Sequence, residues 1–93
     1  FLGFPPHKKG RQTFFRKIGE TPETIVFYES KHRIIKTLEE LRDKALIGER
    51  RLMVARELTK QFETIYRGTA GEILEQLNKT KVLGEFVVVI RAK

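Results

Sequence analysis

Charged residues follow two of the apolar runs in this sequence, at positions where chemistry could take place. Phe27-Tyr28 leads into Glu29, and Val54-Ala55 leads into Arg56-Glu57. In open α/β sheets, ligands gather beyond the carboxyl ends of the strands. If the two strands run in the same direction, both charged groups lie at one edge of the sheet. A strand that simply reaches solvent also ends in charge, but two such ends at one edge favour a binding site.

A helix is predicted over residues 31–46, directly after the first of these strand ends. Its first turn carries Lys31, His32 and Arg33, where the helix dipole makes each cation unfavourable by about 0.3–1 kcal/mol. Two explanations stay open. Either an anion binds the free N–H groups, as a phosphate or the carboxylate of an amino-acid-like cofactor would, or Glu29 offsets Arg33 by a local ion pair.

The N-terminal segment offers a second candidate surface. His7-Lys8-Lys9-Gly10-Arg11 is basic, and Phe14-Phe15-Arg16-Lys17 places aromatic rings beside further cations. Cations next to rings on which bases can stack are typical of nucleic-acid surfaces. The Phe residues also fit the buried side of a short helix, and we expect them in the core. The Lys and Arg side chains remain the candidates for phosphate contact.

Composition narrows the class of protein. The chain has 93 residues, a hydrophobic fraction of 40% and a formal net charge of +7, which favours polyanionic partners. It has no Cys, so disulfides and thiolate metal sites are excluded and a cytoplasmic protein is expected. No apolar run reaches the roughly 18 residues of a membrane span, and no signal peptide is recognisable. The chain opens without Met, and we expect a domain from a longer polypeptide.

The sequence contains no recognisable motif of a self-contained active site. The glycines form neither a dinucleotide-binding G-x-G-x-x-G nor a phosphate-binding P-loop. His7 and His32 lack the spacing of metal ligands, and no G-x-S-x-G nucleophile motif is present. We therefore predict no metal site.

The hydrophobic pattern predicts the elements that position these residues. Uninterrupted apolar runs at 25–28, 52–55 and 86–90 are typical of strands buried on both faces. Thr69 and Glu72 form a capping box that opens a helix. The predicted helices are 12–18, 31–46 and 70–79, and the predicted strands are 1–4, 24–29, 51–57, 64–68 and 85–91. We expect a single α/β domain over residues 1–93, with a mixed sheet of about five strands and helices on both faces. The strand 64–68 should be antiparallel to its predecessor and near an edge.

Five segments together resemble a known family. They are GFPPHKKG (3–10), FYESKHR (27–33), VARELTKQFE (54–63), IYRGT (65–69) and GEFVVVI (84–90). In this order they resemble the C-terminal half of the bacterial small-subunit ribosomal RNA cytidine 2′-O-methyltransferases, within the tetrapyrrole (corrin/porphyrin) methylase superfamily. The likeness covers nearly the whole chain. It departs from the family at Lys31, where Pro is usual, and at Pro5, where Leu is usual, which affects the start of a helix and the shape of a loop.

The resemblance implies two α/β domains with S-adenosylmethionine in the cleft between them. Because the glycine-rich loops of the first domain are absent, the chain resembles half an enzyme, inactive alone. The implied partners are small-subunit ribosomal RNA within its subunit, the missing N-terminal domain and a second copy in a homodimer. The residues implied at the cofactor are Arg56, Glu57, Thr59 and Phe62, and those expected to contact RNA are Lys8, Lys9, Arg11 and Arg33.

Methyl transfer to a ribose hydroxyl requires orientation of the reactants and removal of the hydroxyl proton. The carboxylates available as a base are Glu57, Glu63 and Glu29, while Lys60 would need a lowered pKa. The choice among them stays open, and so does a base in the missing half. Two other functions also stay open: a non-catalytic basic RNA-binding module, and a structural or dimerisation domain.

Overall fold

The three predicted helices and four of the five predicted strands are present in the computed structural model, which describes residues 3–6, 8–43, 47, 49–57, 62–79 and 84–93. Their bounds lie within two residues of those expected, except for the second helix, which begins three residues later and whose expected end at 44–46 lies outside the described residues. In chain order the elements are α1 (Arg11–Glu20), β1 (Ile25–Ser30), α2 (Ile34–Asp43), β2 (Leu52–Glu57), β3 (Phe62–Gly68), α3 (Ala70–Asn78) and β4 (Glu85–Ile90).

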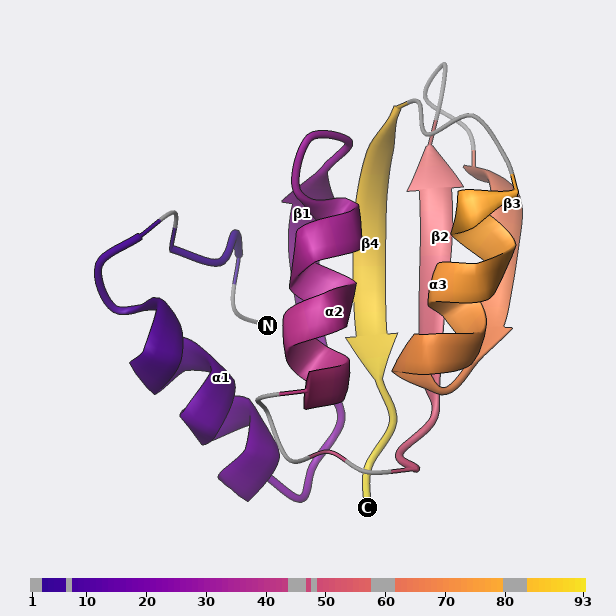
Figure 1. Cartoon of the computed structure of the whole chain (residues 1–93). Coiled ribbons are helices and arrows are strands. Elements are labelled where there is room, and N and C mark those ends of the chain that lie inside the picture. The colour runs from indigo at the N-terminus through magenta and orange to yellow at the C-terminus, as the bar shows by residue number, and fades with distance from the viewer. Residues whose placement is uncertain (1–2, 7, 44–46, 48, 58–61, 80–83) are drawn as a thin grey trace.

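The sheet has the strand order β1-β4-β2-β3, and every described pairing is antiparallel. β4, the last of the described strands, therefore lies between β1 and β2 (Figure 1). The prediction of a mixed sheet is wrong for these strands, because β4 separates β1 from β2 and runs opposite to both. The antiparallel strand at the edge, predicted at 64–68, is confirmed as β3.

The strand expected at residues 1–4 is not found in its described part. Residues 1 and 2 lie outside the described residues, and Gly3 and Phe4 are not in a strand. The carbonyl oxygen of Gly3 accepts a hydrogen bond from the backbone N–H of Tyr28 at 2.8 Å. This contact ties the N-terminal segment to β1 without extending the ladder, so the described sheet has four strands.

The helices cover one face of the sheet. Figure 1 shows α2 and α3 side by side over it, and the ring of Phe14 in α1 meets Phe27 of β1 edge-on at 5.7 Å on the same side. Alternate strand residues point into this layer, as the burial of Ile25, Phe27 and Glu29 shows. The core between the layers includes Phe15, Ile18, Phe27, Ile34, Leu38, Leu41, Val54, Ile73, Leu77, Phe86, Val88 and Ile90.

The opposite side of the sheet, called the open face below, is covered by none of the described helices. Its residues Val26, Val87, Val89 and Met53 are half-buried, and Tyr28 is 41% exposed. The prediction of helices on both faces is therefore not supported in the described part of the chain. An uninterrupted apolar run indicates that both faces of a strand are apolar, but it does not say what covers them.

A buried arginine joins three parts of the chain at the end of the sheet where β4 finishes. Arg50 is 8% exposed and donates hydrogen bonds to backbone carbonyl oxygens, at 2.8 Å to Arg91 and Thr21 and at 2.9 Å to Glu23. A longer bond of 3.4 Å reaches the carbonyl of Ile18 near the end of α1. The negative end of the helix dipole offsets part of its charge.

The capping box predicted for the last helix is confirmed. The Thr69 hydroxyl accepts from the Glu72 N–H at 3.3 Å, and the Glu72 carboxylate accepts from the Thr69 N–H at 2.8 Å. Gly68 precedes it with φ of 142°, where a Cβ would lie 2.8 Å from that carboxylate, so glycine is required. The hydrogen bonds from Thr69 hold the pKa of Glu72 below its ordinary value.

None of the described helices is long and apolar enough to cross a membrane.

The capping box predicts how stability depends on pH. Because the pKa of Glu72 is lowered by folding, its carboxylate stabilises the fold above the unfolded pKa of about 4.3 and loses this effect as pH falls through the folded pKa. Glu72→Gln should therefore lower the melting temperature at pH 7, with the difference shrinking below about pH 4.5. Thermal melts between pH 7 and pH 3 test this, with Glu75→Gln on the same helix as the control. A difference that stays constant down to pH 3 would contradict the prediction.

Candidate functional site

The two charged strand ends lie at the same edge of the sheet, which is called the rim below. β1 and β2 are both antiparallel to β4, so they run in the same direction. Phe86 of β4 is the register partner of Glu29 on one side and of Arg56 on the other. The strand spacing places the backbones of these two residues about 10 Å apart. This confirms the expectation that the charges meet at one edge when the two strands share a direction.

Arg56 is held on the side of the sheet that faces the helices. Its side chain is half-buried, and Nη2 donates to the hydroxyl of Thr64 in β3 at 3.1 Å. The register shifts directly after this residue, so that Glu57 pairs with Phe62. A bulge of this kind bends the strand and redirects side chains, and bulges are common beside functional sites.

Glu57 lies half-buried at the end of β2, with Glu85 of β4 as its register partner. Thr59 lies outside the described residues. Phe62 and Glu63 belong to β3, but their side chains are outside the description. Of the cofactor residues implied by the resemblance, the structure therefore places the side chains of Arg56 and Glu57, next to each other at the rim.

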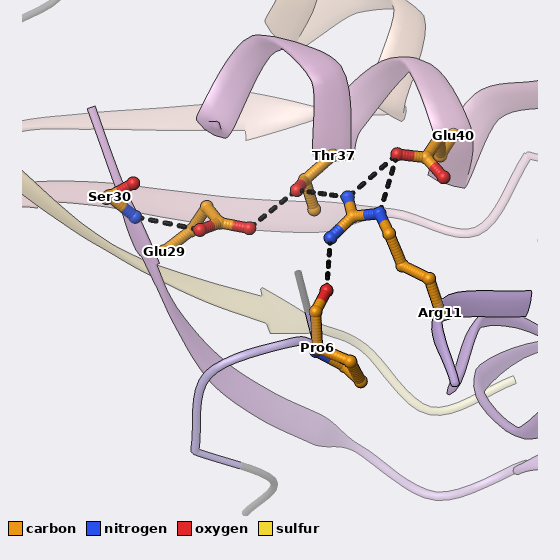
Figure 2. A network of polar contacts seen from close by, with 6 residues as sticks. All are labelled: Pro6, Arg11, Glu29, Ser30, Thr37 and Glu40. Carbon is orange, nitrogen blue, oxygen red and sulfur yellow. Dashed lines mark hydrogen bonds and ion pairs between the residues drawn. The ribbon is translucent and has the colours of Figure 1, made fainter. Parts of the chain in front are cut away.

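Glu29, a candidate base, is buried and already bonded. It is 2% exposed; Oε1 accepts from the Ser30 N–H at 2.9 Å and Oε2 accepts from the Thr37 hydroxyl at 2.5 Å (Figure 2). No ion pair joins it to Arg33 in the described part of the chain. Both oxygens accept hydrogen bonds within the fold, and the burial of Glu29 keeps its carboxylate away from a substrate hydroxyl at the surface.

Lys31, His32 and Arg33 form a turn before α2, and the prediction that they occupy its first helical turn is wrong. The Arg33 N–H donates to Ser30 at 3.1 Å, and the Arg33 carbonyl accepts the helical bond from Thr37 at 2.8 Å. The chain therefore enters the helix only after the cations. Lys31 and His32 are exposed and Arg33 is half-buried.

Arg11, expected to contact RNA, points into the protein instead. It is 7% exposed, and its guanidinium donates to Glu40 at 2.7 and 2.9 Å, to the Thr37 hydroxyl at 2.9 Å and to the Pro6 carbonyl at 2.8 Å (Figure 2). Its guanidinium carbon also lies 5.0 Å from the centre of the Phe15 ring. This placement does not fit a contact with RNA. Lys8 and Lys9, in the turn before α1, are exposed.

The bonds of Glu29 and Arg11 form one connected network that sequence reasoning missed. The hydroxyl of Thr37, which is fully buried, donates to Glu29 and accepts from Arg11. One signal was available: Thr37 lies three residues after Ile34, on the apolar stripe of α2, where a polar residue needs a partner. Nothing in the sequence identified Arg11 as that partner.

A hollow of about 670 Å³ lies on the open face beside the rim. It is lined by Phe4, Val26, Tyr28, Glu57, Glu85, Phe86 and Val87. The rings of Phe4 and Tyr28 lie 5.6 Å apart. The hollow has apolar walls and two carboxylates, and its volume is in the range of small-molecule or side-chain sites. Among the described residues, no group of three or more His, Asp or Glu is placed to hold a metal ion.

Comparison with known proteins identifies a family and several relatives that this chain resembles. Residues 1–74 match the family of tetrapyrrole (corrin/porphyrin) methylases. Proteins named ribosomal RNA small subunit methyltransferase I are similar over nearly the whole chain. The relative from Streptococcus pyogenes is 43% identical over 97% of this chain and 31% of its own length. Those from Thermotoga maritima and Bacillus subtilis are each 36% identical, over 41% and 30% of their own lengths. The chain thus spans between 30% and 41% of the length of these curated relatives.

The buried network predicts a specific loss of stability. Thr37→Val removes the hydroxyl between Glu29 and Arg11 while keeping the shape of the side chain, so two buried groups each lose a hydrogen bond. We expect a loss of about 1–3 kcal/mol in the free energy of unfolding, measured by urea titration. Thr37→Ser is the matched control, because it keeps the hydroxyl and removes only a methyl group. Equal stability of the two variants would show that the hydroxyl contributes nothing.

Proposed function

The chain belongs to the tetrapyrrole methylase family, and on this basis we propose that it is part of an enzyme that methylates small-subunit ribosomal RNA. The single observation that carries the proposal is its likeness, over 97% of its length or more, to proteins named as small-subunit ribosomal RNA methyltransferases. The net charge of +7 agrees with a polyanionic substrate. A ribosomal substrate also fits the expected cytoplasmic location.

We propose more specifically that S-adenosylmethionine supplies the methyl group and that a cytidine 2′-hydroxyl receives it, as the family resemblance implies. The rim residues fit such a cofactor, because an amino-acid group carries both a carboxylate and an ammonium. Arg56 offers a guanidinium for the first, and Glu57 a carboxylate for the second. Thr59 and Phe62 stay in the proposed cofactor set through the resemblance alone.

Within the enzyme, this chain would orient the reactants and hold charge at the rim. Arg56 is itself steadied by Thr64, so a bound carboxylate would meet a guanidinium already restrained in position. Of the carboxylates considered as the base, Glu57 lies at the rim, whereas Glu29 is engaged in the buried network. We therefore favour Glu57 and Glu63 over Glu29 as the base, and Glu57 would serve either as the base or as the partner of the cofactor's ammonium, not as both. Because the chain spans only part of its relatives, we propose that it is inactive without the remaining domain.

An assay of the intact protein that carries this chain tests the function. We expect methyl transfer from S-adenosylmethionine to small ribosomal subunits, with the product mapped to the 2′-hydroxyl of a cytidine. RNA binding without any methyl transfer would favour a non-catalytic RNA-binding module. Neither activity, in a correctly folded protein, would favour a structural or dimerisation domain.

The role of Arg56 can be measured without catalysis. Arg56→Ala in the intact protein should weaken S-adenosylmethionine binding about 10- to 100-fold, because hydrogen bonds to charged groups contribute about 1.5–3 kcal/mol. Titration calorimetry gives the affinity. Arg42→Ala, at the exposed end of α2, is the control and should bind like the wild type. Unchanged binding in Arg56→Ala would remove this residue from the cofactor site.

The exposed lysines before α1 are the better-placed RNA contacts. A double variant, Lys8→Ala with Lys9→Ala, should weaken RNA binding and reduce the slope of log affinity against log salt by about 1.4, which is the loss of two phosphate contacts on a single strand. Filter binding across a salt series measures this slope. Lys36→Ala with Lys79→Ala, at two other exposed positions, is the control for the loss of two positive charges, and an equal reduction there would mean that only net charge matters.

A further inference from the structure

Three exposed arginines gather at the end of the sheet that lies opposite the rim. Arg51 directly precedes β2 and Arg91 directly follows β4. The Arg91 N–H donates to the Arg51 carbonyl at 3.0 Å, which continues the pairing of these two strands. Arg67 of β3 is the register partner of Met53, two residues after Arg51. The three cations therefore lie on adjacent strands, far from the charged residues of the rim.

The three arginines line a hollow of about 380 Å³, which is called the basic hollow below. Its remaining walls are apolar and come from Leu52, Met53 and Val89. Neighbouring strands are about 4.8 Å apart, so the backbones of the three arginines span about 10 Å across β4, β2 and β3. The basic hollow thus combines an apolar lining with cations that are spread more widely than a single phosphate group.

The charge of the basic hollow is largely uncompensated. In the described part of the chain, no ion pair reaches Arg67 or Arg91. Arg51 lies 3.9 Å from the carboxylate of Glu72, and both side chains are 58% exposed, so this contact contributes little. Arg51 and Arg91 also face each other directly, an arrangement of like charges that is destabilising. A bound anion would remove this repulsion.

A smaller hollow of about 250 Å³ adjoins the basic hollow and shares Arg51 and Arg91 with it. It adds two exposed side chains of opposite charge, Lys93 and Glu49. Their charges offset each other, so the excess of positive charge at this end of the sheet comes from the arginines. The Lys93 N–H donates to the Pro22 carbonyl at 2.8 Å, which holds the segment after β4 in place.

A buried arginine fixes the backbone beneath the basic hollow. Arg50 donates to the Arg91 carbonyl at 2.8 Å, and its other donors reach the carbonyls of Thr21 and Glu23 at 2.8 and 2.9 Å. Arg50 also directly precedes Arg51 in the chain. The two facing arginines are therefore attached to backbone that is already in position before a ligand arrives, which lowers the entropy cost of binding.

We propose that the basic hollow binds backbone phosphates of the RNA substrate, several nucleotides away from the one that is methylated. The inference rests on the proposed function, because it takes ribosomal RNA as the substrate, and it adds a second place where that RNA is held. Arg91 lies six positions after Glu85 at the rim, a distance of about 20 Å along the strand. A phosphate bound here anchors the strand whose target ribose lies at the rim.

A phosphate chain fits the basic hollow for two reasons. Guanidinium groups match phosphate oxygens by paired hydrogen bonds, and cations spread over about 10 Å suit several linked phosphates better than one free ion. The carboxylates of Glu57 and Glu85 at the rim do not oppose this binding, because 20 Å is well beyond the Debye length of about 8 Å at physiological ionic strength.

RNA binding by the intact protein that carries this chain tests the inference. Arg67→Gln with Arg91→Gln removes two of the three guanidinium groups. The affinity for small-subunit ribosomal RNA should fall about 10-fold at physiological salt, and the slope of log affinity against log salt should decrease by about 1.4, as for two phosphate contacts on a single strand. Filter binding across a salt series measures both. Lys36→Gln with Lys79→Gln, at exposed positions on the helix side, is the matched control and should leave both nearly unchanged.

Two further measurements separate the basic hollow from simple charge and from the rim. Arg67→Lys with Arg91→Lys keeps the charge but should still lose part of the affinity, because lysine binds phosphate as a point charge. The affinity for S-adenosylmethionine should be unchanged in every variant. In the methyl-transfer assay, the glutamine variant should raise KM for small ribosomal subunits and leave kcat unchanged, because a remote contact contributes equally to the ground state and the transition state.

The possible outcomes distinguish failure of the inference from failure of the proposed function. A wild-type protein that binds RNA, together with a glutamine variant that binds it equally well, overturns the inference alone and leaves the basic hollow to an acidic protein partner. A wild-type protein that binds no RNA overturns the proposed function as well. A lower kcat at saturating subunits would contradict the remote role. Circular dichroism confirms that each variant, altered only at exposed side chains, is folded.

Discussion

The position of α1 and α2 relative to the sheet depends on a charge held out of water. Arg11 reaches from α1 to Glu40 and Thr37 of α2, and Thr37 passes the connection to Glu29 of β1. A buried guanidinium without partners would be very costly. Its donors reach a carboxylate and a hydroxyl of α2 and a carbonyl of the segment before α1, and Thr37 links them to a third segment, β1. The network is satisfied only when these segments have their native arrangement, so it discriminates against other packings of two short apolar helices.

The same network makes the two carboxylates at the rim, Glu29 and Glu57, differ in their accessibility. Glu29 and the Arg56–Glu57 pair leave parallel-running strands at the same edge, but Glu29 is enclosed beneath α2 whereas Glu57 borders a hollow. From the sequence alone, both Glu29 and Glu57 qualified as functional residues, because each lies at the end of a strand. The difference comes from what lies beside each carboxylate. The Thr37 hydroxyl of α2 donates to Glu29, whereas Glu57 lines the hollow on the open face.

Sequence reasoning succeeded where the determinants are local. The capping box at Thr69 depends on neighbours three residues apart, and the apolar stripe of α2 on a helical period, and both are as predicted. It failed where distant segments decide. No residue near Arg11 in the sequence shows that Glu40 will form an ion pair with it, so the basic stretch around Arg11 suggested an RNA-binding surface. The run Phe86–Ile90 correctly indicated a strand apolar on both sides, yet whether a helix or another protein surface covers each side is settled by topology and assembly.

The central place of β4 also constrains how the protein is made. β1 and β2 are not neighbours, and each pairs along its inner edge with β4, which follows both of them in the sequence. Chains emerge from the ribosome N-terminus first, so these two inner edges stay unpaired until residues 85–90 have been synthesised. Until then only local structure, such as the helices and the β2–β3 hairpin, can form. Completion of the described sheet is therefore a long-range event that depends on the synthesis of β4.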